Sequence, residues 1–319
     1  MKKLWETIRV FLFPTSILLV FSLFLSSCGM NVQTQSPIEI DLNNLQPLPT
    51  PNDLEVLPFK VAIAAVISPE GTAESYAPLL NYLETKLERP IKLVQRRTYA
   101  EINDLIKTGD VDLAFVCTSA YVAGRRDFNM QLLVAPIVNG ETFYHSQLIV
   151  PVGSPAASLI DLRGKVFAFT DPMSFSGRMF PTYLLQQIGE TPASFFQRTF
   201  FTYSHDDAIR SVADGLADGA AVDSLVLEFA LDRNPALADK INIIYTSPPF
   251  GIPPVVVSPL IRPQQHAQLE EIFLNMHTTT AGLEALQSLD VERFAIVSEE
   301  LYDAVAEIEK AVAGEMDYP

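Results

Sequence analysis

Residues 165–188 read Lys-Val-Phe-Ala-Phe-Thr-Asp-Pro-Met-Ser-Phe-Ser-Gly-Arg-Met-Phe-Pro-Thr-Tyr-Leu-Leu-Gln-Gln-Ile and hold the pattern that decides the fold. The apolar run at 165–170 predicts a buried strand, and residues 177–188 predict a helix. Ser174, Phe175 and Ser176 then lie at the turn between them. The first backbone N–H groups of a helix have no internal partner and carry partial positive charge, so this turn predicts an anion site.

The small residues of this turn fit that interpretation. Serine hydroxyls add rotatable donors, and Gly177 is expected to let the backbone approach a ligand oxygen closely. A purely structural alternative is that Ser174 or Ser176 only caps the helix, as serine often does.

The same alternation of strands and helices extends over most of the chain. Strands are expected at 59–67, 91–94, 111–116, 132–138, 146–152, 165–170, 199–203, 219–222, 241–246 and 255–257, and helices at 73–87, 99–107, 177–188, 206–216, 224–231, 263–276, 279–287 and 299–313. Such alternation indicates β-α-β units around a mainly parallel sheet.

Two such α/β sets, with a proline-rich return at 248–254, predict two lobes joined by two hinge crossings. We expect lobe 1 to comprise residues 59–147 and 252–319, and lobe 2 residues 148–251. The cleft between them, at the carboxyl ends of the strands, is the expected ligand site. The helical tail beyond Val297 packs on lobe 1 or supports an oligomer.

The N-terminus predicts export. Lys2, Lys3 and Arg9 precede an apolar run of about 15 residues, which is typical of a signal peptide and short for a membrane span of about 20. Leu-Ser-Ser-Cys at 25–28 resembles a bacterial lipobox, so residues 1–27 are expected to be removed and Cys28 lipidated. The alternative is an uncleaved N-terminal anchor with a chance cysteine.

The stretch 28–58 changes in character and composition. It is polar, contains five prolines and has no hydrophobic period, which predicts an extended, disordered tether behind the lipidated residue. The folded body would then stand off the outer face of a membrane, periplasmic or at the cell surface.

The composition bounds the class of partner. Hydrophobic residues make up 48 % and charged residues 19 % of the chain, which are globular values. The formal charge is −16, and −18 without residues 1–27, so no attraction to nucleic acid is expected. An anionic ligand must therefore be recognised locally, by oriented dipoles and neutral donors.

Four segments together resemble one family. Asp-Pro-Met-Ser-Phe-Ser-Gly at 171–177 resembles the Asp-Pro-x-Ser-x-Ser-Gly signature of phosphate/phosphite/phosphonate-type ABC-transporter substrate-binding proteins. In chain order, 143–150 resembles the family's hinge strand, 203–206 its histidine segment and 218–224 the lobe 2 turn that faces the cleft. The resemblance covers about residues 59–275. It implies a type II periplasmic-binding-protein fold that closes on its ligand.

The resemblance also implies ligand contacts. His205 would donate to an oxyanion, or else it is a polar residue at a helix start. Asp223 would accept from a protonated oxyanion or a ligand amine, or else cap the following helix. Tyr144 would donate from the hinge and Tyr76 from the first helix, or else both belong to the core.

Residues 115–121, Phe-Val-Cys-Thr-Ser-Ala-Tyr, depart from the family. Cys117 and Thr118 follow a strand end that faces the cleft, so both are placed to touch ligand, and Thr118 and Ser119 are expected to serve at a helix N-terminus. Cys117 leaves the ligand open between a phosphorus oxyacid and a soft species such as arsenite. It is otherwise a small packing residue.

Three classes of function follow from these features. The first is a monomeric, lipid-anchored receptor that delivers a phosphonate, phosphite or phosphate to an ABC permease. The second is a ligand-sensing protein for a membrane sensor kinase, with an oxyanion such as arsenite. An enzyme is not expected, because the four histidines have no metal-ligand spacing and no Gly-x-Ser-x-Gly motif occurs. No metal or cofactor is expected.

Overall fold

A computed structural model describes residues 57–315. The expected signal peptide, Cys28 and the tether up to residue 56 lie outside the described residues, as do residues 316–319. Within the described part, no helix combines the length and the apolar character that a membrane crossing requires.

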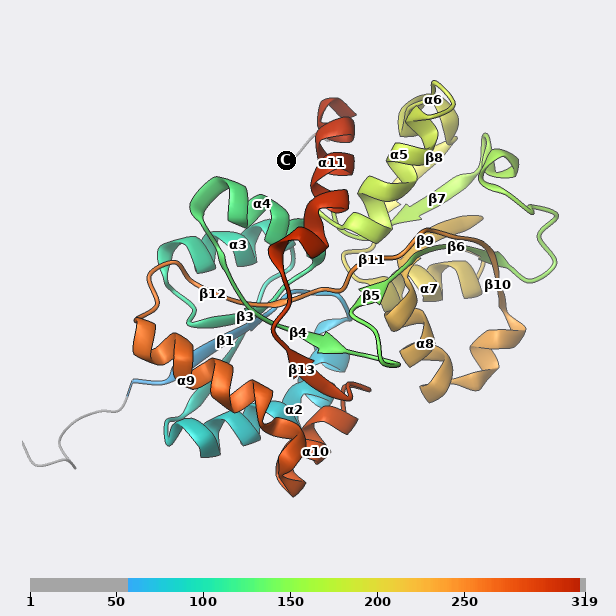
Figure 1. Cartoon of the computed structure of the whole chain (residues 1–319). Coiled ribbons are helices and arrows are strands. Elements are labelled where there is room, and N and C mark those ends of the chain that lie inside the picture. Colours follow the sequence, from blue (N-terminus) through green and yellow to red (C-terminus); the bar gives the residue numbers. More distant parts are fainter. Residues whose placement is uncertain (1–56, 316–319) are drawn as a thin grey trace, which may run out of the picture. The chain divides into compact units, whose positions relative to one another are not determined.

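The first sheet has six strands in the order β13-β4-β12-β3-β1-β2 (Figure 1). We call the part of the chain built on it lobe 1. Its strands are β1 (Phe59–Ile63), β2 (Ile91–Gln95), β3 (Leu113–Phe115), β4 (Gln131–Ile137), β12 (Val255–Val257) and β13 (Arg293–Ala295). Its helices are α2 (Pro69–Leu87), α3 (Tyr99–Thr108), α4 (Thr118–Phe128), α9 (Pro263–Leu274), α10 (Thr280–Gln287) and α11 (Asp303–Val312), with short helices η5 (Met276–Thr278), η6 (Glu299–Tyr302) and η7 (Ala313–Glu315).

The second sheet has five strands in the order β10-β6-β9-β7-β8, and we call the part built on it lobe 2. Its strands are β6 (Ser146–Pro151), β7 (Val166–Phe169), β8 (Arg198–Phe201), β9 (Gly219–Asp223) and β10 (Ile241–Thr246). Its helices are η2 (Leu159–Leu162), η3 (Phe175–Met179), α5 (Phe180–Gln186), α6 (Pro192–Phe195), α7 (His205–Ala213), α8 (Ser224–Arg233) and η4 (Pro235–Asp239).

Both sheets are mixed, whereas the sequence predicted a mainly parallel one. In lobe 1, β1 pairs parallel with β2 and β3, but the returning strand β12 inserts between β3 and β4 and runs antiparallel to both. In lobe 2, β7 pairs parallel with β8 and β9, but β6 lies between β9 and β10 and runs antiparallel to both. The difference arises because β6 and β12, the first sheet strands after the two crossings between the lobes, run against their neighbours, as does β13 beside β4.

Two further features connect the lobes. The crossings pair with each other as β5 (Phe143–Tyr144) and β11 (Phe250–Gly251) in a two-stranded antiparallel sheet. The C-terminal helix α11 contacts α4 of lobe 1 and α5 of lobe 2 and lies between them in Figure 1. The tail therefore packs on both lobes, rather than on lobe 1 alone. The lobe limits at 147 and 252 remain our proposal.

The strand-to-helix turn has the predicted form, with one difference. Strand β7 ends at Phe169, and the segment after the turn begins as the π-helix η3 before it continues as α5. Gly177 packs against Thr170, whose side chain would overlap a Cβ at this position. The structure thus explains this glycine by close packing of the turn on its own strand, and not by approach to a ligand.

We therefore expect Gly177→Ala to lower the free energy of unfolding by about 1–3 kcal/mol, as overpacking does in a dense interior. Gly71→Ala is the matched control, because its added Cβ would be 3.5 Å from the nearest atom and Gly71 lies in helix α2. The control should be neutral or gain about 0.5–1 kcal/mol. Guanidinium denaturation measures both, and equal stabilities would contradict the packing explanation.

Candidate functional site

The serines of the turn are buried and have different roles. Ser174 Oγ accepts a hydrogen bond from the Gly177 N–H at 3.0 Å, so Ser174 does cap the helix. Ser176 Oγ is buried without a hydrogen-bond partner among residues 57–315. The Ser176 carbonyl accepts from the Ser146 hydroxyl at 2.7 Å, which fixes the turn on strand β6. The Ser176 hydroxyl therefore has no partner among the described residues, whereas Ser174 Oγ already accepts a hydrogen bond.

His205 is the first residue of helix α7 and is fully buried. The backbone N–H of Asp223 donates to His205 Nδ1 at 3.0 Å, so the ring carries its proton on Nε2. Burial lowers the pKa of His205 to about 3 against the opposing effect of Asp206, so the ring is neutral. Its Nε2 lies 3.5 Å from Ser174 Oγ. His205 thus offers one neutral N–H donor beside the turn.

Asp223 ends strand β9 and is also buried. Its Oδ1 accepts from the N–H groups of Leu225 and Val226 at the start of helix α8, which confirms the capping role. Burial raises its pKa to about 7, although these two hydrogen bonds oppose the shift. The carboxyl group can therefore take up a proton near neutral pH and act as donor or acceptor.

Two tyrosines place unpaired hydroxyls next to these groups. The hydroxyls of Tyr99 and Tyr144 are buried with no hydrogen-bond partner within the described chain. Burial raises the pKa of both well above 10, and the charges of Cys117 and Asp223 add to the effect in each case. The hydroxyls of Thr118 and Ser176 lie near Tyr144 and oppose its shift without reaching hydrogen-bond geometry.

Cys117 occupies the N-cap position of helix α4 without a side-chain capping hydrogen bond, and its thiol lies beside the Phe175 backbone in the turn of lobe 2. Burial raises the pKa of its thiol, and the backbone N–H of Phe175 and the Ser119 hydroxyl oppose the shift. Its Sγ lies 3.7 Å from Ser119 Oγ. The thiol is therefore protonated at neutral pH, which removes the repulsion that a thiolate would exert on an anion.

We call these groups the buried polar cluster: Tyr99, Cys117, Tyr144, Ser174, Ser176, His205 and Asp223. They come from both lobes and from crossing strand β5, and no cationic side chain belongs to the set. The cluster presents neutral O–H, N–H and S–H donors in a desolvated space. A buried donor left unpaired costs about 1–3 kcal/mol, so this arrangement suits an oxygen-rich ligand.

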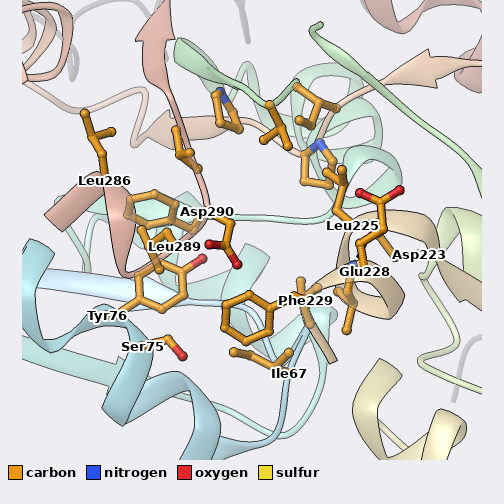
Figure 2. Close-up of a pocket in the computed structure, with 18 of the residues that line it drawn as sticks. Ile67, Ser75, Tyr76, Asp223, Leu225, Glu228, Phe229, Leu286, Leu289 and Asp290 are labelled. Atoms are coloured by element: carbon orange, nitrogen blue, oxygen red, sulfur yellow. Dashed lines mark hydrogen bonds between the residues drawn. The ribbon is translucent and has the colours of Figure 1, made fainter. Parts of the chain in front are cut away.

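Three residues predicted at the site have other contacts. The Phe175 ring packs on Phe250 with centroids 4.6 Å apart, so only its backbone faces the cluster. The Thr118 hydroxyl donates to the Gly251 carbonyl at 2.9 Å. Tyr76 lies apart from the cluster in the wall of a neighbouring cavity (Figure 2).

The sequence interpretation missed Tyr99, gave Asp171 no role of its own, and placed Ser119 only at a helix N-terminus. Tyr99 follows the capping residue Thr98 and has the spacing of an ordinary core residue of α3. The Ser119 hydroxyl donates to the Met173 carbonyl of lobe 2. Only Asp171 carried a signal, because it opens the quoted signature.

Two carboxylates of lobe 2 hold helix N-termini of lobe 1. Asp171 accepts from the Tyr99 N–H at 3.2 Å, and Asp206 accepts from the Ser68 N–H at 2.8 Å, at the starts of α3 and α2. The backbone N–H of His205 donates to the Val66 carbonyl at 2.9 Å. These contacts close the two lobes over the cluster, and the helix dipoles favour a carboxylate at each position.

Comparison with known proteins agrees with this geometry. Residues 61–302 match the family model described as ABC transporter, phosphonate, periplasmic substrate-binding protein. The chain belongs to this family. Its members are substrate-binding components rather than enzymes, and the predicted type II periplasmic-binding-protein fold is confirmed.

Individual proteins and solved structures are also similar to this chain. The phosphate-import protein PhnD of Mycolicibacterium smegmatis is 29 % identical over 212 residues, which cover 62 % of this chain and 66 % of the relative, slightly less than two thirds of its length. A binding protein component of an ABC phosphonate transporter from Pseudomonas aeruginosa has a TM-score of 0.76 at 20 % identity, covering 83 % of this chain and 91 % of that one. PhnD1 of Prochlorococcus marinus, in complex with methylphosphonate, has a TM-score of 0.72 at 20 % identity, covering 80 % and 98 %.

The titration of Asp223 provides a test of the buried cluster. Between pH 3.8 and about 7 the folded state holds a proton that the unfolded state has lost, so this group makes the free energy of unfolding fall as pH rises through that window. An asparagine side chain does not titrate there, and it keeps an oxygen that caps α8. We expect the stability of Asp223→Asn relative to wild type to rise between pH 5 and pH 8 in guanidinium denaturation. A difference that does not vary with pH would show that Asp223 is not buried as described.

Proposed function

We propose that this chain is the extracytoplasmic solute-binding protein of an ABC transporter and that it captures a small phosphorus oxyanion in the buried polar cluster. One observation carries the proposal. The hydroxyls of Tyr99, Tyr144 and Ser176 are buried without partners among the described residues, in the same cluster as the neutral ring N–H of His205. A ligand with several oxygens would satisfy all of them at once.

The ligand class follows from the chemistry of these donors. They are neutral, so affinity comes from hydrogen bonds and the helix N-termini of η3 and α4, in a chain with a formal charge of −16. Asp223, with a pKa of about 7, accepts from a ligand that keeps one acidic proton. Phosphonate, phosphite and phosphate can carry such a proton at neutral pH, as sulfate cannot. The names of the relatives, which include phosphate import and a methylphosphonate complex, agree with this class.

The thiol of Cys117 favours transport over the sensing of arsenite. It is the one free cysteine among the described residues, and burial raises its pKa. A soft trivalent arsenic species is held firmly by several sulfur ligands, and the described residues supply a single buried thiol. Cys117 fits better as a small neutral group that contacts the hydrogen or methyl group on phosphorus.

The ligand class is tested by isothermal titration of the purified chain with phosphate, phosphite, methylphosphonate, 2-aminoethylphosphonate, sulfate and arsenite. We expect binding of at least one phosphorus oxyanion and none of sulfate or arsenite. Tyr144→Phe should weaken the binding of that oxyanion about tenfold or more, because a hydrogen bond to a charged group contributes about 1.5–3 kcal/mol. The same variant should keep or raise the free energy of unfolding, since it removes an unpaired buried hydroxyl.

Tyr121→Phe is the matched control for that variant. The Tyr121 hydroxyl is also buried without a partner in the described structure, but it lies toward Arg125 and Glu299, away from the cluster. Its removal should leave oxyanion affinity unchanged. Binding of no phosphorus oxyanion, or equal affinity in Tyr144→Phe and wild type, would refute the proposed site.

We further propose that Cys28 carries the lipid anchor. In cells that express the full chain, wild type should incorporate labelled palmitate and partition into the detergent phase on Triton X-114 separation, whereas Cys28→Ser should do neither. Cys117→Ser, the only other cysteine substitution available, should behave as wild type. A membrane-bound, unlabelled wild-type protein would indicate an uncleaved N-terminal anchor instead.

A further inference from the structure

A cavity adjoins the buried polar cluster at Asp223. It has a volume of about 680 Å³ and is lined by residues of both lobes and of the crossings. Pockets for small organic ligands measure roughly 300–1,000 Å³. An inorganic oxyanion or methylphosphonate, held by the cluster, would leave this space unused.

The walls of the cavity are largely apolar and aromatic. Tyr76 and Phe115 of lobe 1 pack edge to face with ring centroids 5.1 Å apart, and Phe115 lies 6.4 Å from Phe294. Phe229 of helix α8 faces them from lobe 2 (Figure 2). The remaining apolar contacts come mainly from Val66, Ile67, Leu225, Val226, Leu286 and Leu289.

Among the described residues that line the cavity, the charged side chains are all carboxylates. Asp223 is buried, whereas Glu228, Asp232, Asp290 and Glu292 are exposed and therefore surround its mouth. Figure 2 shows the Asp290 carboxylate directed into the space between Tyr76 and Phe229. The guanidinium of Arg233 lies 3.8 Å from the centroid of the Phe229 ring. It donates hydrogen bonds to the Ser75 hydroxyl and to the Ser288 carbonyl.

Asp223 connects the two spaces. Its Oδ1 is used in capping α8, and the residue belongs both to the buried polar cluster and to the lining of the cavity. A ligand anion in the cluster would therefore have its substituent directed past Asp223 into the cavity. The substituent would meet aromatic faces first and carboxylates at the mouth.

We propose that the cavity binds the organic substituent of an organophosphorus ligand and that this substituent is bulky, apolar and positively charged, like a quaternary ammonium group. The inference rests on the proposed function, because it assigns the substrate class of the same site. Aromatic rings and carboxylates together attract such a cation, whose methyl groups also bury apolar surface. An anionic substituent would be repelled by the lining, and a small one would not fill it.

The test compares three ligands that share the phosphonate group. Methylphosphonate has only the anion, 2-(trimethylammonio)ethylphosphonate adds the bulky cation, and 3,3-dimethylbutylphosphonate replaces its nitrogen with carbon and is otherwise the same shape. We expect isothermal titration of the full chain in detergent to give about tenfold or tighter binding of the cationic ligand than of either other ligand.

Asp290→Asn tests the charge without a change in shape. Asp290 has a backbone φ of 53°, in the left-handed region that asparagine also tolerates. The variant should bind the cationic ligand several-fold more weakly and methylphosphonate unchanged. Asp104→Asn, an exposed carboxylate on α3 outside the cavity, is the control for net charge and should match wild type.

The outcomes separate the two proposals. Binding of methylphosphonate with equal or weaker binding of both larger ligands would overturn the cavity inference and leave the proposed function standing. Equal affinity for the cationic ligand and for 3,3-dimethylbutylphosphonate would overturn the proposal that the substituent must be positively charged. Failure of all three, together with phosphate and phosphite, would overturn the proposed function and the inference with it.

Discussion

The site depends on the 3.0 Å hydrogen bond from the Asp223 backbone N–H to His205 Nδ1. It joins the end of strand β9 to the start of helix α7 and fixes the proton of the ring on Nε2. Because burial keeps the ring neutral, this proton is available for donation without a buried positive charge. The same residue, Asp223, then caps α8 through its side chain. One residue thus sets both the tautomer of the donor and the position of the next helix.

The contacts that close the two lobes also use the N-termini of helices. Asp171 and Asp206 hold the starts of α3 and α2 by accepting hydrogen bonds from backbone N–H groups of lobe 1, and Asp206 also lies 3.8 Å from the guanidinium of Arg210 within its own helix. Apart from Asp223, the donors of the buried polar cluster keep the same charge near neutral pH. Burial raises the pKa of Asp171 to about 6, so its contact with the start of α3 weakens in mild acid.

The sequence predicted what is encoded locally. The strand, turn and helix of residues 165–188, the helix starts at His205 and Ser224, and the donors on them followed from apolar runs and small polar residues. The direction of the strands did not follow from the sequence, because it depends on where a crossing segment re-enters a sheet. Strand β13 was missed because its three residues show no hydrophobic period. Tyr99 could not be recognised, since its hydroxyl reaches the cluster only when α3 packs against the other lobe. Tyr76 was predicted as a ligand contact of the cluster but faces the adjoining cavity.

A net charge of −16 is at first sight unfavourable for a protein that binds an anion. The arrangement of groups removes most of this conflict. At neutral pH the buried polar cluster contains no full charge except the partly ionised Asp223, and the exposed carboxylates are screened by salt within about 8–10 Å. A long-range field that repels anions weakens their association, whereas the desolvated donors and helix N-termini act only on a ligand that has entered. For a ligand that carries a cation as well, the dipole formed by an acidic mouth and a neutral, donor-rich base orients the molecule before the lobes close. The acidic surface then contributes to selection instead of opposing it.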